Sequence, residues 1–157
     1  MKPKVYIETS IPSYLTARPS HDIRAMANQQ ITIEWWECSQ EKFDLYISEL
    51  VLNEAAQGNP EAATRRLAVL KEIAEIDASI DADKLAKILL KKAALPEKAK
   101  IDASHIAIAT INAMDYLLTW NCKHIANAVM RPKIEDICRD YGYQLPIICT
   151  PQQLMEN

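Results

Sequence analysis

Glycine is scarce in this chain, with only Gly58 and Gly142 among 157 residues. A phosphate-binding Walker A loop follows the pattern G-x-x-x-x-G-K, and a dinucleotide fingerprint follows G-x-G-x-x-G. Two glycines so far apart can form neither pattern. The sequence therefore excludes nucleotide chemistry that depends on these loops.

The chain also has few cysteines, no long apolar run and a small net charge. The four cysteines show no C-x-x-C spacing, which favours reduced thiols with packing roles over disulfides or a zinc site. No run approaches the ~18 apolar residues of a membrane span, and the N-terminus shows no signal peptide, so we expect a cytoplasmic protein without membrane contact. The net charge of −3 offers no broad basic surface. Any nucleic-acid contact should therefore be local and metal-assisted.

Short apolar segments alternate with helical patterns along the chain. The apolar segments predict strands at residues 4–8, 45–47, 116–120 and 145–149, and a further edge strand at 76–80. Apolar residues at three- and four-residue steps, with their flanking caps and breakers, predict helices at residues 20–40, 49–57, 61–75, 81–94, 97–114, 121–128 and 132–141. This alternation predicts an α/β fold with a parallel sheet, and the length suits one domain over residues 1–157.

Four polar side chains stand where apolar segments end or turn. Glu8 follows the first strand, and Asn121 follows the strand at 116–120. Glu54 and Asp102 lie in helical segments that are otherwise largely apolar. Burying an unpaired carboxylate costs several kcal/mol, and the apolar segments around these groups, residues 5–8, 50–56, 101–109 and 116–121, contain no arginine or lysine. If the four groups converge, a divalent cation is the expected partner.

The topology offers these groups a common meeting place, because ligands of open α/β sheets bind beyond the carboxyl ends of the strands. Carboxylates that meet there would repel one another, and Mg²⁺ or Mn²⁺ would relieve that repulsion by binding their oxygens. Such a site can activate a water and stabilise a leaving oxygen, which indicates phosphodiester hydrolysis. The hydroxyls of Thr9, Ser10 and Thr119 stand beside the candidate ligands and are expected to orient them or a water.

The order of these motifs resembles that of PIN-domain proteins, specifically the VapC-type toxins of bacterial toxin–antitoxin systems. The matching segments are Y-I-E-T-S at residues 6–10, S-E-L-V-L-N-E at 48–54, D-A-S-H-I-A-I-A at 102–109 and T-W-N at 119–121. The resemblance covers nearly the whole chain. It implies a single PIN-like domain with a three-layer α/β/α fold around a central, mostly parallel sheet.

The resemblance also implies a function, namely a Mg²⁺- or Mn²⁺-dependent endoribonuclease that cuts RNA as a toxin. It implies a homodimer and a cognate antitoxin whose tail enters the acidic groove. Carried over residue by residue, Glu8, Glu54 and Asp102 would bind the metal, and Asn121 would complete the site directly or through water. Two residues depart from the family, because aspartate is usual at the positions of Glu8 and Asn121. These changes are consistent with one bound metal or an altered choice of metal.

Each candidate ligand also has a structural interpretation. Glu54 could pair with Arg65 or Arg66, Asp102 could cap its helix, and Asn121 could be a turn residue. If only repulsion between acids matters, Glu54→Gln should leave the melting temperature unchanged or raise it.

Two histidines lie near the candidate ligands in the sequence. We expect His105 to lie in or near the core and His124 to lie near the site but at the surface.

A PIN-like binding module that lacks catalysis is the second candidate function. A phosphoacceptor receiver domain is disfavoured, because the chain lacks an acidic pair after its first strand and a lysine after its last.

Overall fold

A five-stranded sheet forms the centre of the computed structural model, which describes residues 1–155. Every pairing in this sheet is parallel, and the strand order is β3-β2-β1-β4-β5. The strands are β1 (Lys4–Ile7), β2 (Asp44–Ile47), β3 (Ala74–Glu75), β4 (Tyr116–Leu118) and β5 (Ile147–Cys149). The expected parallel sheet is thus confirmed, and the first strand of the chain lies in its middle.

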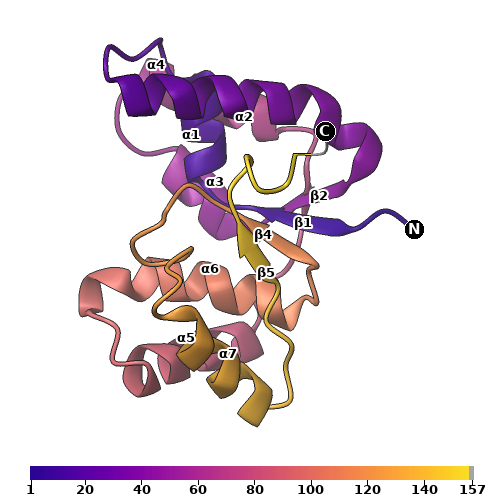
Figure 1. Ribbon diagram of the computed structural model, residues 1–157, viewed down its shortest axis with the longest axis vertical. Coiled ribbons are helices and arrows are strands. Elements are labelled where there is room, and N and C mark those ends of the chain that lie inside the picture. The colour runs from indigo at the N-terminus through magenta and orange to yellow at the C-terminus, as the bar shows by residue number, and fades with distance from the viewer. Residues whose placement is uncertain (156–157) are drawn as a thin grey trace.

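Seven α-helices cover the two faces of the sheet in the described part of the chain. They are α1 (Ser10–Thr16), α2 (Ile23–Lys42), α3 (Glu49–Ala55), α4 (Pro60–Leu70), α5 (Ile80–Lys92), α6 (Lys100–Ile111) and α7 (Arg131–Asp140). Figure 1 shows α1, α2 and α4 on one side of the sheet and α5, α6 and α7 on the other. The expected three-layer α/β/α arrangement is therefore confirmed. None of the helices between residues 1 and 155 has both the length and the apolar character needed to cross a membrane.

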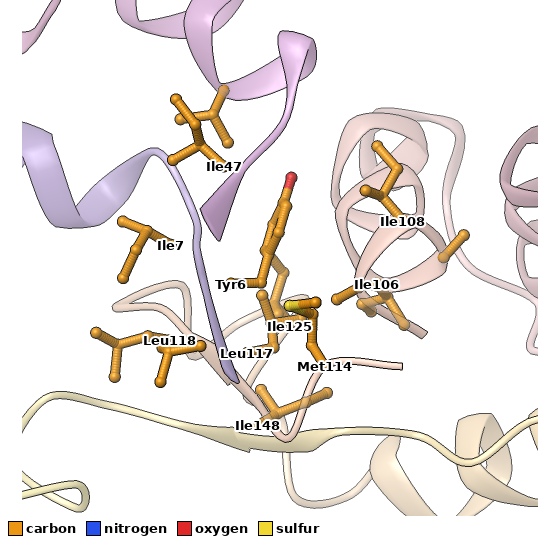
Figure 2. Packing of buried hydrophobic residues seen from close by; sticks show 14 of the residues in the cluster. Tyr6, Ile7, Ile47, Ile106, Ile108, Met114, Leu117, Leu118, Ile125 and Ile148 are labelled. Carbon is orange, nitrogen blue, oxygen red and sulfur yellow. The ribbon is translucent and has the colours of Figure 1, made fainter. Parts of the chain in front are cut away.

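The central strands are apolar on both faces because helices cover both. Val5, Tyr6 and Ile7 of β1 are all fully buried, as are Leu117 and Leu118 of β4. Continuous burial of this kind distinguishes parallel strands from the alternating pattern of a half-exposed sheet. In Figure 2, Tyr6 extends from β1 into the space between Ile47 of β2 and Ile106 of α6.

The register of β1 and β4 brings the residues that follow them together. Ile7 pairs with Leu118, and the Glu8 amide then donates to the Leu118 carbonyl at 3.1 Å. The Thr119 amide donates in the same way to the Cys149 carbonyl of β5. Glu8 and Thr119 thus lie side by side at the carboxyl edge of the sheet, where the sequence predicts the site.

The helix predicted at residues 121–128 is wrong, because the structure has a series of turns there. The Ile125 amide donates to the Asn121 carbonyl at helical spacing, but the Ala126 amide donates to the same carbonyl five residues earlier, so the helical pattern does not continue. The Asn127 side chain accepts from the amides of Val129 and Met130. Asparagine side chains that bond to nearby backbone groups compete with helix formation, which explains the difference.

The predicted helix at 61–75 and strand at 76–80 are displaced in the structure. Helix α4 ends at Leu70, and the edge strand β3 already lies at Ala74–Glu75. Residues just before α5 cannot extend the strand, because the Ser79 side chain caps that helix by accepting from the Ala82 amide. The predicted helix at 97–114 is shorter than expected, since a 3-10 turn precedes α6 and Ile111 ends it.

Candidate metal-binding site

Glu8 stands directly after β1 and is 5% exposed. Its Oε1 accepts a hydrogen bond from the Thr119 hydroxyl at 2.6 Å and another from the Ser10 hydroxyl. Ser10 is the first residue of α1, so the turn from strand to helix directs its hydroxyl back to Glu8. Two of the three hydroxyls expected from the sequence to orient the candidate ligands therefore contact this carboxylate.

Glu54 comes from α3 and meets the third hydroxyl. Its Oε1 accepts from the Thr9 hydroxyl at 2.7 Å and from Nε2 of His105. Burial acts to raise the pKa of the Glu54 carboxyl, but the hydrogen bond and charge of His105 and the bond from Thr9 outweigh it. The pKa of Glu54 is therefore lowered, and the carboxylate is stabilised in its ionised form.

His105 is the functional residue that sequence reasoning missed. It lies in α6 with no exposed surface, so its expected core position is confirmed. Its Nδ1 is hydrogen-bonded to the Tyr6 hydroxyl at 2.7 Å, and that hydroxyl is hydrogen-bonded to the Ser48 hydroxyl at 2.8 Å. Burial raises the pKa of Tyr6 well above its usual value, so the phenol keeps its proton.

Two spacings in the sequence indicate that His105 and Tyr6 lie on the same faces as the candidate ligands. His105 lies three positions after Asp102, so both occupy one face of their helix. Tyr6 lies two positions before Glu8, so the pleat directs both side chains to one side of the sheet. A polar residue on the face of a candidate ligand is a candidate partner, even in an apolar helix.

Asp102 and Asn121 form a second pair beside the first group. Nδ2 of Asn121 donates to Oδ1 of Asp102 at 3.0 Å, and Oδ1 of Asn121 accepts from the His124 amide at 3.1 Å. The pKa of Asp102 is raised, chiefly by burial and further by the negative charge of Glu8, although His124, His105 and the Asn121 bond act in the opposite direction. The influence of Glu8 indicates that the two carboxylates are electrostatically coupled.

The structural interpretations of the candidate ligands fare differently. Glu54 pairs with His105, whereas Arg65 and Arg66 donate their Nε protons to the backbone carbonyls of Thr16 and Ala55. The ion pair between Glu54 and these arginines is therefore wrong. The N-terminus of α6 has no side-chain cap hydrogen bond, but Asp102 lies in its first turn, where the helix dipole favours a carboxylate. The turn role of Asn121 is confirmed by its bond to the His124 amide.

The chemistry of the assembled donors suits a divalent cation. Glu8, Glu54 and His105 each offer one ligand atom, and these three atoms lie within 4.8 Å of one another. Asp102 and Asn121 lie outside this group of three. Asp102 is nevertheless near it, because the negative charge of Glu8 acts to raise the pKa of Asp102. Within residues 1–155, no lysine or arginine forms an ion pair with the carboxylates of Glu8, Glu54 or Asp102. Carboxylate oxygens are the ligands that Mg²⁺ and Mn²⁺ prefer, and imidazole also suits several transition metals.

An all-parallel sheet between two helical layers, with acidic side chains at its carboxyl edge, matches the PIN-like fold. Among solved structures, the chain is similar to VapC20 of Mycobacterium tuberculosis, described as a Sarcin-Ricin loop cleaving toxin. The TM-score is 0.59 at 17% identity, over 79% of this chain and 95% of that chain. It is also similar to VapBC2 from Rickettsia felis bound to a DNA fragment from their promoter. That match has a TM-score of 0.58 at 18% identity, over 94% of this chain and 98% of the other.

These likenesses show a shared fold and confirm the PIN-like architecture expected from the sequence. A scan against protein-family models finds no match, and a search of curated proteins finds no relative. Function therefore has to be argued from the site itself.

Proposed function

We propose that this chain is a metal-dependent endoribonuclease of the VapC type, a toxin that a cognate antitoxin neutralises. The observation that carries the proposal is the meeting of Glu8 and Glu54, whose ligand atoms come within 4.8 Å together with His105. Two carboxylates so close repel one another unless a cation or other positive charge is present. The shared fold adds support, because both similar structures contain VapC toxins.

In this proposal Glu8, Glu54 and Asp102 hold Mg²⁺ or Mn²⁺, and Asn121 completes the site directly or through water. When bound, the ion supplies Lewis-acid stabilisation of a phosphodiester and a more acidic water. The chain's own hydroxyls keep the carboxylates oriented, since Ser10 and Thr119 bond to Glu8 and Thr9 bonds to Glu54. Asn121 holds Asp102 in place through its amide.

The proposed partners follow from the proposed activity. RNA is the substrate, and the cation reduces the repulsion between the acidic site and the phosphates. The antitoxin blocks the same groove, the toxin acts as a homodimer, and both work in the cytoplasm. Induced expression should arrest bacterial growth, and co-expression of the antitoxin should restore it.

Cleavage of RNA by the purified protein tests the proposal directly. We expect cleavage with Mg²⁺ or Mn²⁺, its loss on chelation, and its loss in Asp102→Asn. Asp81→Asn is a matched control, because Asp81 also lies in the first turn of a helix but is exposed. Absence of cleavage with any divalent metal would contradict the nuclease.

One observation favours the second candidate, a binding module without catalysis. Glu8 and Glu54 already accept two hydrogen bonds each from the chain, and Asn121 contributes no charge where aspartate is usual in the family. Their carboxylates are thus partly satisfied without a cation. Binding of RNA or antitoxin without cleavage would identify the protein as such a module.

A further inference from the structure

A chain of buried hydrogen bonds runs behind the candidate metal-binding site. It begins at the Ser48 hydroxyl, passes through the Tyr6 hydroxyl at 2.8 Å and reaches Nδ1 of His105 at 2.7 Å. Nε2 of His105 then contacts Oε1 of Glu54. Ser48, Tyr6 and His105 are fully buried, so this chain joins the core to the edge of the site. We call these three residues the Ser48–Tyr6–His105 chain.

The proton positions follow from the chemistry of the partners. An ionised carboxylate can only accept, so Nε2 of His105 must carry the proton that it shares with Glu54. This holds whether the ring is neutral or charged. Nδ1 can then accept from the Tyr6 hydroxyl or donate to it, and the Ser48 hydroxyl can adapt to either direction.

Packing in the core holds the imidazole of His105 in place, whereas the Glu54 side chain that it contacts is flexible. The rings of Tyr6 and His105 are 5.8 Å apart between centroids and come from β1 and α6, two elements of the packed core. Glutamate has three side-chain torsions, and its carboxylate is partly exposed here. The bonds from Thr9 and His105 both reach Oε1, which leaves the lone pairs of Oε2 for another ligand.

We propose that His105 is a positioning residue, which orients the Glu54 carboxylate toward a bound cation and is itself held by Tyr6 and Ser48. The inference rests on the proposed metal site and adds a residue to it. Metal-binding carboxylates are commonly fixed by such partners, whose loss lowers metal affinity or activity by roughly 10- to 100-fold.

Substitutions at position 105 separate positioning from mere filling of the core. The amide nitrogen of His105→Gln reaches the place of Nε2 and can still donate to Glu54. The amide of His105→Asn reaches only the place of Nδ1, and His105→Leu donates nothing. Titration of each purified protein with Mn²⁺ alone, followed by calorimetry, should show affinity lowered by about tenfold or more in the Leu and Asn variants. The Gln variant should stay within roughly threefold of the wild type.

Tyr6, which bonds to the other side of the His105 ring, gives an independent comparison. Tyr6→Phe removes the hydroxyl that holds His105, so Mn²⁺ affinity should fall, though less than in His105→Leu. Tyr46→Phe removes a hydroxyl from the neighbouring strand β2 outside the Ser48–Tyr6–His105 chain, so affinity should not change. Thermal melts establish that each variant folds. If His105→Leu does not fold, the Gln and Asn variants and Tyr6→Phe still decide the matter.

Three results would overturn the proposal. Mn²⁺ affinity could be unchanged in a folded His105→Leu, or the Gln variant could bind no better than the Leu variant. Alternatively, the electron spin-echo spectrum of bound Mn²⁺ could show coupling to a histidine nitrogen that is absent in His105→Gln, which would make His105 a ligand. These measurements need no RNA, so they are separate from the proposed function. A wild type that binds Mn²⁺ with the expected order of variants but cuts no RNA would contradict only the nuclease.

Discussion

Glu54 illustrates how a single neighbour changes the expected effect of a substitution. Considered from the sequence, Glu54 is one acid among three, and its removal should relieve repulsion. In the structure it accepts a hydrogen bond from His105, and its pKa is lowered in spite of its burial. The ionised carboxylate therefore stabilises the fold, and its loss should be unfavourable.

We expect Glu54→Gln to abolish RNA cleavage and to lower the free energy of unfolding at pH 7 by about 1–2 kcal/mol, because a charge-assisted hydrogen bond is lost. Chemical denaturation measures this change. Glu49→Gln is the matched control, since Glu49 lies exposed in the same helix.

The effect of Glu54→Gln should also depend on pH in a defined direction. A carboxylate whose folded pKa lies below its ordinary value of 4.5 stabilises the protein above that pH. This stabilisation is lost as the pH falls through the folded pKa. The stability difference between wild type and variant should therefore shrink in acid, and a difference that grows there would contradict the assignment.

Asp102 should respond in the opposite sense. Its pKa is raised above the ordinary 3.8, first by burial and then by Glu8, so its ionised form is disfavoured in the folded state. Asp102→Asn should raise the melting temperature at pH 7 by at most about 3 °C, because the group is half-exposed and screened. The gain should vanish as the pH falls below 3.8, where the unfolded chain is also protonated. A melting temperature lowered at pH 7 would count against this account.

The sequence predicted a meeting of acids but not the full set of contacts. Glu8 and Glu54 were predictable as neighbours because each follows a parallel strand at the same edge of the sheet. The role of Asp102, Asn121 and the other candidates as metal ligands stays a prediction. The bond between His105 and Glu54 was not predictable, because it depends on side-chain directions across α3 and α6.

At the level of elements, strands were easier to predict than loops. The β1 and β4 segments are short apolar runs, which is the pattern that a sheet covered on both faces requires. The region from residue 121 to 128 has helical composition, but the Asn127 side chain bonds to the amides of Val129 and Met130, and the backbone forms turns instead of a helix. The ends of α4 and α6 also moved, because capping and strand pairing depend on tertiary contacts.

Helix α7 and strand β5 supply a simple test of the packing. Cys138 and Cys149 are buried in these elements, and burial raises the pKa of both thiols to about 11. Cys38 and Cys122 are exposed. A thiol reagent at pH 8 should therefore label two cysteines rapidly in the native protein and all four after unfolding. Rapid labelling of Cys138 or Cys149 would show that α7 and β5 are not packed in this way.

At the level of the whole molecule, the assignment of residues 1–157 to one domain stays a prediction. The apolar cluster contains residues of β1, β2, β4 and β5 and of helices on both faces of the sheet. A single core of this extent should unfold cooperatively. Denaturation followed by tryptophan fluorescence and by far-UV circular dichroism should give one coincident transition. Two separated transitions would indicate independently folding parts.

The central position of β1 has a consequence for biosynthesis. Strand β1 precedes β4 by more than 100 residues, and the acidic edge needs both, because Glu8 takes its amide and side-chain contacts from Leu118 and Thr119. Since nascent chains fold only as their segments emerge, the acidic edge cannot close on the ribosome before residues 116–119 are available to pair with β1.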